Sequence, residues 1–172
     1  MKTDKPTTKI IAGKYKGKVL ELPSLEVTRS SKAMLKESLF NVLQFDIIDK
    51  IFIESFAGSG SIGLEAISRG AKRAYFIELD KNSYQILLRN CKSVDMEKCQ
   101  TVQGNTFVQT PLFIDFLKNS KDEIVLYVDP PFDYRDGMED IYEKSFSMIQ
   151  NIEVDNIYMI IVEHVSSLEM PE

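Results

Sequence analysis

The sequence predicts an α/β domain in which a parallel β-sheet carries helices on both faces. Three observations support this fold class. From Ile51 onward, short β-type apolar runs alternate with stretches of helical spacing. A glycine-rich turn, Gly58–Gly63, directly follows the first of these runs. A later apolar run ends in Asp129 and two prolines, which stops a strand where open α/β sheets place their reactive groups.

Five strands and four helices are expected after residue 50. The strands are Ile51–Ser55, Arg73–Glu78, Cys99–Gln103, Ile124–Asp129 and Ile157–Glu163. The helices lie near Ser61–Arg69, Asn82–Val94, Thr106–Asn119 and Met138–Gln150, and we expect Pro111 to interrupt the third of them. Strands that alternate with helices in this way form βαβ units, and these units produce a parallel sheet.

The segment before residue 51 has a different character. Lys9–Leu22 contains two β-prone runs around Gly13 and Gly17, which predicts a β-hairpin, and Ser31–Leu43 has helical spacing. The hairpin carries a basic face made of Lys14, Lys16 and Lys18. We therefore divide the chain into an N-terminal extension formed by the basic hairpin and the helix (residues 1–45) and a main domain (residues 46–172).

Charge is distributed unevenly along the chain. The net charge is −5, which by itself argues against a nucleic-acid partner, yet residues 1–40 hold nine basic and four acidic side chains. An asymmetry of this size indicates either a basic arm on an acidic body or a merely solvated, lysine-rich terminus. Two cysteines and one histidine exclude a disulfide framework and a structural zinc site, and no metal is expected. Without a signal peptide or an apolar span, we expect a cytoplasmic protein that does not contact the membrane.

The glycine turn predicts a site for a nucleoside-containing cofactor. Glu54–Gly63 reads ESFAGSGSIG, and Glu78 lies 20 residues beyond Gly58 at the end of the next expected strand. That carboxylate suits the ribose hydroxyls of NAD and of S-adenosylmethionine equally well. Glu54 favours the methyl donor, because its carboxylate attracts a sulfonium and an ammonium but repels the pyrophosphate of NAD.

The element VLYVDPPF, at Val125–Phe132, points to chemistry on an amine. Two prolines remove two N–H groups and leave the carbonyls around Asp129 and Pro130 free to accept hydrogen bonds from an exocyclic amine. Phe132 supplies a face on which a flipped-out base can stack. Asp129 accepts only, which matches the adjacent N1–H and N2–H donors of guanine, whereas the donor and acceptor of adenine suit an amide better.

Asn105 follows the third expected strand, where the adenine of a cofactor would lie. Its side chain can bond the adenine edge or cap the next helix, and the sequence leaves both roles open. His164 is expected to be a surface residue.

Together these segments resemble the RsmD-type 16S ribosomal RNA guanine-N2 methyltransferases of bacteria. The likeness covers KIIAGKYKGKVLELP, TRSSKAMLKESLFNVL, ESFAGSGSIGLEAISRGA, FIELD and VDPPF. It implies a Rossmann-like class I methyltransferase fold with a small N-terminal β-hairpin extension. It also implies S-adenosylmethionine as methyl donor and 16S rRNA or the small ribosomal subunit as partner, and we expect a monomer.

The resemblance also assigns roles by position. The cofactor would contact Glu54, Phe56, Gly58, Gly60, Glu78 and Asn105, and the target base would contact Asp129, Pro130 and Phe132. RNA would contact Lys14, Lys16, Lys18, Arg29 and Lys36, and the last two belong to a stretch with Glu37 and Asn41 that packs near cofactor and RNA.

Three departures and three alternatives stand beside this interpretation. The family has Arg-Pro-Thr where this chain has Arg29-Ser30-Ser31 and a second arginine at Met34, and it continues through two strands after the position of Glu163. A methyltransferase acting on adenine-N6 or on a protein glutamine remains open. So do a non-catalytic nucleotide- or RNA-binding module and an NAD oxidoreductase.

Overall fold

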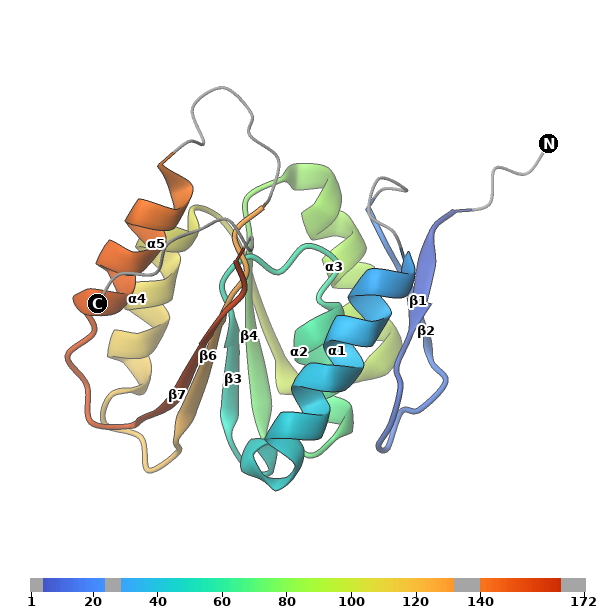
Figure 1. Ribbon diagram of the computed structural model, residues 1–172, viewed down its shortest axis with the longest axis horizontal. Helices are drawn as coiled ribbons and strands as arrows, with labels where there is room; N and C mark the ends of the chain where they lie inside the picture. Colours follow the sequence, from blue (N-terminus) through green and yellow to red (C-terminus); the bar gives the residue numbers. More distant parts are fainter. Residues whose placement is uncertain (1–4, 24–28, 132–139, 165–172) are drawn as a thin grey trace.

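The computed structural model describes residues 5–23, 29–131 and 140–164, and Figure 1 shows their arrangement. A five-stranded parallel sheet has the strand order β5-β4-β3-β6-β7. Its strands are β3 (Ile51–Glu54), β4 (Arg73–Glu78), β5 (Cys99–Gln103), β6 (Ile124–Val128) and β7 (Ile157–Val162). The helices are α1 (Arg29–Leu43), α2 (Ser61–Ser68), α3 (Lys81–Val94), α4 (Thr106–Leu117) and α5 (Ile141–Gln150), with 3-10 turns at Gln44–Ile47 and Met96–Lys98. The predicted α/β fold is confirmed.

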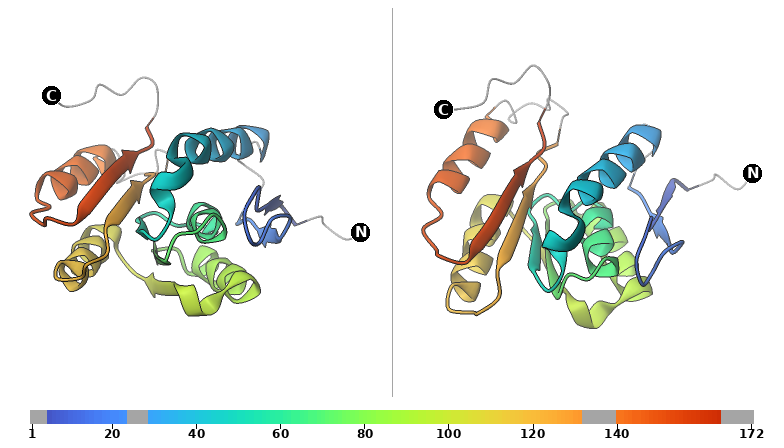
Figure 2. Two further views of the ribbon diagram at one scale, coloured as in Figure 1. Left: turned by 90° about the horizontal axis from the view of Figure 1, so that it is seen from below. Right: turned by 60° about the horizontal axis from the view of Figure 1, so that its bottom comes forward.

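The end-on view in Figure 2 shows helices on both faces of the sheet. A hydrophobic core lies beneath the helices on each face. Alternate residues of β3 serve different cores: Phe52 packs with α1, α2 and α3, whereas Ile51 and Ile53 pack with α4 and α5. All four residues of β3 are buried, as expected for a central parallel strand. The apolar, non-alternating pattern of this strand follows from burial on both faces.

The order of the strands determines where a ligand can bind. From β3 the chain continues outward through β4 and β5 and then returns to β6 on the other side of β3. Where the order reverses, the loops after two neighbouring strands diverge and leave a crevice at the carboxyl ends of the strands. That reversal lies between β3 and β6, so the loops that follow Glu54 and Val128 flank it.

The expected interruption at Pro111 is wrong, because α4 runs through it without a break. A proline inside a helix costs about 3 kcal/mol, chiefly through a lost hydrogen bond and a clash with the preceding turn. Pro111 is exposed, whereas Ile114 and Leu117 on the same helix are buried in the core beneath. Packing of that face against the sheet outweighs the local penalty.

The N-terminal hairpin consists of β1 (Thr7–Lys9) and β2 (Val19–Glu21), which pair antiparallel as predicted. Its two central apolar side chains, Ile10 and Leu20, are fully buried in the core beneath α1, α2 and α3. The hairpin is therefore packed firmly onto the body of the molecule. The division into domains at residue 45 stays a prediction.

A buried carboxylate holds the hairpin turn to helix α2. Glu65 accepts hydrogen bonds from the backbone N–H groups of Ile11 (2.8 Å) and Ala12 (3.2 Å). It also pairs with Lys36 at 3.4 Å and Arg69 at 2.9 Å. These contacts join the hairpin, α1 and α2, and they give Glu65 the paired environment that a buried charge requires.

Candidate functional site

The predicted glycine turn lies at the crevice beside β3. Gly58 and Gly60 have φ of +54° and +79°, a conformation that other residues adopt only at a cost, and α2 begins directly after them. At Gly63 a Cβ would lie 2.3 Å from the Phe76 ring, so only glycine lets the first turn of α2 approach the sheet this closely. Space beside Gly58 is open: nothing lies within 4 Å of where its Cβ would be.

Glu54 ends β3 underneath this turn. Its side chain is buried, and Oε2 accepts a hydrogen bond of 2.7 Å from the Gly63 N–H. The positive end of the α2 dipole stabilises the carboxylate at this position. The structure thus places the negative charge of Glu54 at the base of the glycine turn, where the sequence predicted it.

Glu78 and Gly58 come together although 20 residues separate them. Glu78 Oε1 accepts from the Gly58 N–H at 2.8 Å, and Oε2 accepts from the Asp80 N–H at 2.8 Å. Each carboxylate oxygen can accept more than one hydrogen bond, so further donors can bind to this side chain. The structure thus brings the strand-end carboxylate to the glycine turn, and its predicted contact with a ribose stays a prediction.

Asn105 serves as the N-cap of α4, one of the two roles that the sequence left open. Its Oδ1 accepts from the Phe107 N–H at 2.8 Å. Phe107 in turn meets Phe56 edge to ring, with centroids 5.9 Å apart. The cap occupies only the amide oxygen, and a contact with adenine through the NH₂ group stays a prediction.

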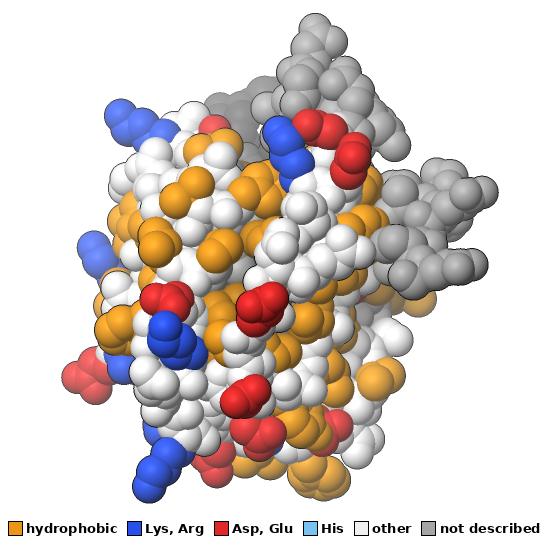
Figure 3. All heavy atoms as spheres, turned by 90° about the vertical axis from the view of Figure 1, so that its left-hand side faces the viewer, with side chains coloured by type: hydrophobic (Ala, Val, Ile, Leu, Met, Phe, Trp, Pro, Cys, Tyr) orange, Lys and Arg blue, Asp and Glu red, His pale blue; other side chains and the backbone are white. Residues whose placement is uncertain are grey.

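A cavity of about 680 Å³ opens between α4 and α5. Among the predicted site residues that the structure describes, only Asn105 lines this cavity, and no residue of the glycine turn does. Figure 3 shows the face on which these helices lie, where acidic and basic side chains are mixed with hydrophobic ones. Exposed apolar residues of α4 are Val108, Leu112 and Phe116.

The second predicted element, Asp129-Pro130, ends β6 next to β3. Glu54 is in register with Tyr127, which stands two residues before Asp129, so the two acidic strand ends are neighbours. Asp129 is half-buried and Pro130 is buried. Phe132, the predicted stacking residue, lies outside the described residues.

Sequence reasoning missed two residues here, Tyr127 and Glu163. The Glu163 N–H donates to the Val128 carbonyl at 3.0 Å, which places Glu163 beside Asp129. Burial raises the pKa of Tyr127, and the negative charges of Asp129, Glu163 and Glu54 raise it further. Burial also raises the pKa of Glu163, while hydrogen bonding to Tyr127 opposes that shift. The charges of three carboxylates thus act on one buried phenol. A sequence signal for Glu163 existed, because it directly follows a strand, as Asp129 does.

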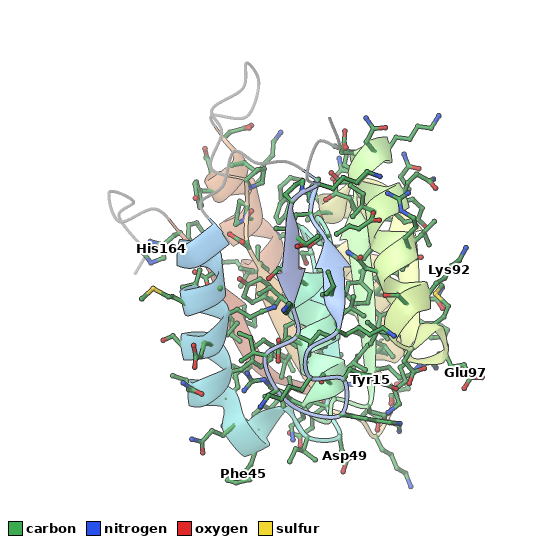
Figure 4. The ribbon with its side chains drawn as sticks, turned by 90° about the vertical axis from the view of Figure 1, so that its right-hand side faces the viewer. Tyr15, Phe45, Asp49, Lys92, Glu97 and His164 are labelled. Carbon is green, nitrogen blue, oxygen red and sulfur yellow. The ribbon has the colours of Figure 1, made fainter. Side chains whose placement is uncertain are left out.

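The predicted basic face is not near this cluster. Lys14, Lys16 and Lys18 are exposed in the hairpin turn. Tyr15, between them, donates a 2.8 Å hydrogen bond from its hydroxyl to Asp95, which precedes β5. Asp49 and Glu97 precede strands and so mark the amino end of the sheet, whereas His164 follows β7 and marks the carboxyl end. In Figure 4, Tyr15 lies toward the end with Asp49 and Glu97, and His164 lies toward the other end. The lysines therefore lie at the amino end of the sheet, away from Asp129.

Lys36 does not fit the predicted contact with RNA. Its side chain is buried, with Nζ 3.0 Å from the Lys9 carbonyl and paired with Glu65. Burial lowers the pKa of Lys36, and the charge of Glu65 opposes this shift. Glu37 and Asn41 on the same helix are exposed, and Arg29 begins the helix, although its side chain lies outside the described part. The structure makes Lys36 a structural cation.

None of the helices in residues 5–23, 29–131 and 140–164 is long and apolar enough to cross a membrane. Within the same ranges, no three His, Cys, Asp or Glu side chains are grouped so that they could hold a metal ion.

Comparison with known proteins gives the family. The model of the family described as "Conserved hypothetical protein 95" matches residues 8–172. The ribosomal RNA small subunit methyltransferase D of Haemophilus influenzae is 38% identical over 133 residues, which cover 76% of this chain and 66% of that protein. Its namesake from Escherichia coli K12 is 34% identical over 125 residues, 72% of this chain and 60% of that protein. The chain therefore spans about 60 to 66% of the length of these relatives.

Solved structures agree with this relationship. A candidate methyltransferase of Escherichia coli, yhhF, superposes with a TM-score of 0.64 at 29% identity, covering 90% of this chain and 75% of that one. A candidate methylase of Haemophilus influenzae superposes with a TM-score of 0.62 at 28% identity, covering 96% and 87%. With a family model that matches nearly its whole length, the chain belongs to the conserved hypothetical protein 95 family, the RsmD-type family that its motifs resemble.

Proposed function

We propose that this protein transfers a methyl group from S-adenosylmethionine to the exocyclic N2 of a guanine in 16S ribosomal RNA. The observation that carries the proposal is the pairing of two strand ends at the crevice. Glu78 is bonded to the glycine turn, and the acidic end of β3 lies beside the strand that ends in Asp129 and Pro130. One side suits a nucleoside-containing cofactor and the other suits an amine.

The residues at the turn fit S-adenosylmethionine. Open space beside Gly58 admits a ligand to the backbone, and the Glu78 carboxylate can accept the two ribose hydroxyls. When bound, the cofactor supplies an electrophilic methyl group on a cationic sulfur. Glu54, Asp129 and Glu163 stand at the ends of the neighbouring strands β3, β6 and β7, so this edge of the sheet carries negative charge. This environment favours a cation and disfavours the pyrophosphate of NAD.

Asp129 and the backbone beside it are suited to hold the acceptor amine. An amine on a conjugated ring is a weak nucleophile, and acceptors for both of its hydrogens draw the nitrogen toward tetrahedral geometry. Pro130 and Pro131 have no N–H, so the carbonyls there meet no competing donor from these two residues. In this proposal the Asp129 carboxylate accepts the proton that the amine loses. Its acceptor-only character favours guanine over adenine.

The hairpin lysines support a large RNA as the substrate. A contact with the phosphate backbone does not require base recognition, and three exposed lysines in one turn supply positive charge. Six residues of β4 span about 20 Å at 3.3 Å each, so an RNA that reaches both the lysines and Asp129 extends at least this far. Ribosomal RNA or the small ribosomal subunit meets that requirement, and a single nucleotide does not.

The test is transfer of labelled methyl from S-adenosylmethionine to 16S rRNA and to small subunits that lack the modification, followed by mapping of the base. Recovery of N2-methylguanosine at one position is the expected result. Label on adenine-N6 or on a protein glutamine would replace the proposal with the other planar-amine reaction. Tight binding of RNA and of S-adenosylhomocysteine without any transfer would indicate a binding module.

A further inference from the structure

Asn90, in the middle of α3, makes three hydrogen bonds that connect three segments of the chain. Its Oδ1 accepts from the Glu21 N–H at 2.9 Å, and its Nδ2 donates to the Glu21 carbonyl at 2.9 Å. The same Nδ2 donates to the Ser59 carbonyl at 2.8 Å. Asn90 is only 3% exposed, and Ser59 stands between the two left-handed glycines of the turn. One buried amide thus links helix α3, hairpin strand β2 and the glycine turn.

The glycine turn is held from two directions. On the sheet side, the Ala57 N–H donates to the Ile77 carbonyl at 2.9 Å, and the Gly58 N–H donates to Glu78. On the helix side, a Cβ on Gly60 would lie only 2.5 Å from the Leu87 side chain of α3, so the turn packs closely against this helix. Asn90, one helical turn further along the same face, supplies the polar contact on this side. Asn90 is buried behind the turn, whereas the space beside Gly58 is open. A ligand that enters beside Gly58 therefore need not break the hydrogen bond between Asn90 and Ser59.

The chemistry of this position requires an amide. Two acceptors, the carbonyls of Glu21 and Ser59, face one NH₂ group, and one donor faces the amide oxygen. An amide satisfies all three, whereas a carboxylate would turn acceptors toward both carbonyls. Loss of the donor would leave a buried carbonyl unsatisfied and free the turn to move away from α3.

We propose that Asn90 is a positioning residue for the cofactor. It holds the Ser59 carbonyl and thereby keeps the Gly58–Gly60 turn in its ligand-accepting conformation before the ligand arrives. A loop ordered in advance loses less conformational entropy on binding, so the gain appears as affinity for the cofactor. The proposal rests on the assignment of S-adenosylmethionine to this turn.

The experiment compares Asn90→Ala and Asn90→Asp with the wild type by calorimetry with S-adenosylhomocysteine and by steady-state kinetics. Loss of one well-placed hydrogen bond predicts a Kd raised about tenfold. The KM for S-adenosylmethionine should rise by the same factor, while kcat at saturating cofactor and the KM for RNA stay within about twofold. Asn90→Asp should be at least as damaging as Asn90→Ala. Should the alanine variant not fold, Asn90→Ser, which keeps one donor, takes its place.

Asn156 provides the matched control. Its Nδ2 also bridges two carbonyls, those of Leu117 (2.9 Å) and Asp122 (3.0 Å), at the amino end of β6 and far from the glycine turn. Asn156→Ala should lower the Tm comparably and leave the Kd unchanged. Arg89→Ala, which removes the exposed ion pair with Glu21 and keeps the amide, should also leave the Kd unchanged.

Two results would overturn the proposal: an unchanged Kd in the Asn90 variants, or a Kd raised equally in Asn156→Ala. The first would leave Asn90 as a structural link to the hairpin, and the second would show that affinity follows overall stability. Failure of the cofactor assignment on which the proposal rests looks different, because wild-type protein would then bind no S-adenosylhomocysteine at all.

Discussion

The two ends of the parallel sheet differ in charge and in kind. The carboxyl end gathers acidic side chains at the ends of four neighbouring strands: Glu54, Glu78, Asp129 and Glu163. The amino end carries the hairpin turn with Lys14, Lys16 and Lys18. Negative charge suits a cationic methyl donor but repels the phosphates of RNA, so attraction for RNA has to come from elsewhere on the molecule. Under the proposed function, methyl transfer and the recognition of RNA take place at opposite ends of the sheet.

The largest effect is expected where the basic end is attached to the body. Glu65→Ala leaves the buried Lys36 without its carboxylate partner and removes the acceptor for Ile11 and Ala12. Breaking a buried pair on one side costs about 3–5 kcal/mol, which urea denaturation can measure. Lys118→Ala removes the exposed pair with Asp115 and should cost less than about 1 kcal/mol. Similar costs for the two variants would mean that Glu65 does not fasten the hairpin.

The acidic end is tested most directly at Asp129. Asp129→Ala should lower methyl transfer by about 10²-fold or more, the scale expected when a positioned proton acceptor is lost, while cofactor affinity persists. Asp129→Asn keeps the shape but turns an NH₂ group toward a guanine donor, so it should be almost as damaging. An amide variant near the wild-type rate would favour an adenine-type or glutamine-type acceptor.

Glu78 tests the cofactor side of the same end. Removal of the carboxylate takes away the proposed ribose contact and the bond to the Gly58 N–H. Glu78→Ala should weaken binding of S-adenosylmethionine by about 1–3 kcal/mol, the range for hydrogen bonds to a charged group. Calorimetry measures this change, and unaltered affinity would place the cofactor elsewhere.

The smallest effect is expected at the basic end, where the contacts are exposed. Replacement of Lys14, Lys16 and Lys18 by alanine should flatten the log–log salt dependence of RNA binding by up to about 2–3, because each phosphate contact releases a counterion. The loss should appear with RNA long enough to span the sheet and vanish with a short stem-loop that reaches only Asp129. If the salt dependence of the triple variant equals that of the wild type, the three lysines belong to a solvated terminus and do not contact RNA. Affinity for the cofactor should not change and serves as the internal control.

Much of the fold could be predicted because its determinants are local. The five strands of the parallel sheet were predicted to within one residue at each end. The signals were apolar runs of strand length, the glycine turn and the proline stop. Pro111 was misjudged because its effect depends on what the rest of α4 packs against, and helix spacing alone does not report that. The glycine turn and its carboxylates were predictable for a similar reason: the carboxyl ends of parallel strands meet at one edge whatever the details of packing.

By itself the sequence determined which residue types stand at the strand ends: Glu54, Glu78 and Asp129 belong to one crevice once the sheet is parallel. Only the tertiary structure decided the surroundings of Lys36, Asn90 and the hairpin lysines. Lys36 and Asn90 have partners 27 and 31 or more residues away, so no local pattern distinguishes a surface lysine from a buried cation, or a polar helix position from a buried amide link. Side-chain burial and the direction of the hairpin result from the packing of distant segments, and that packing places the positive charge at the end of the sheet opposite to the acidic crevice.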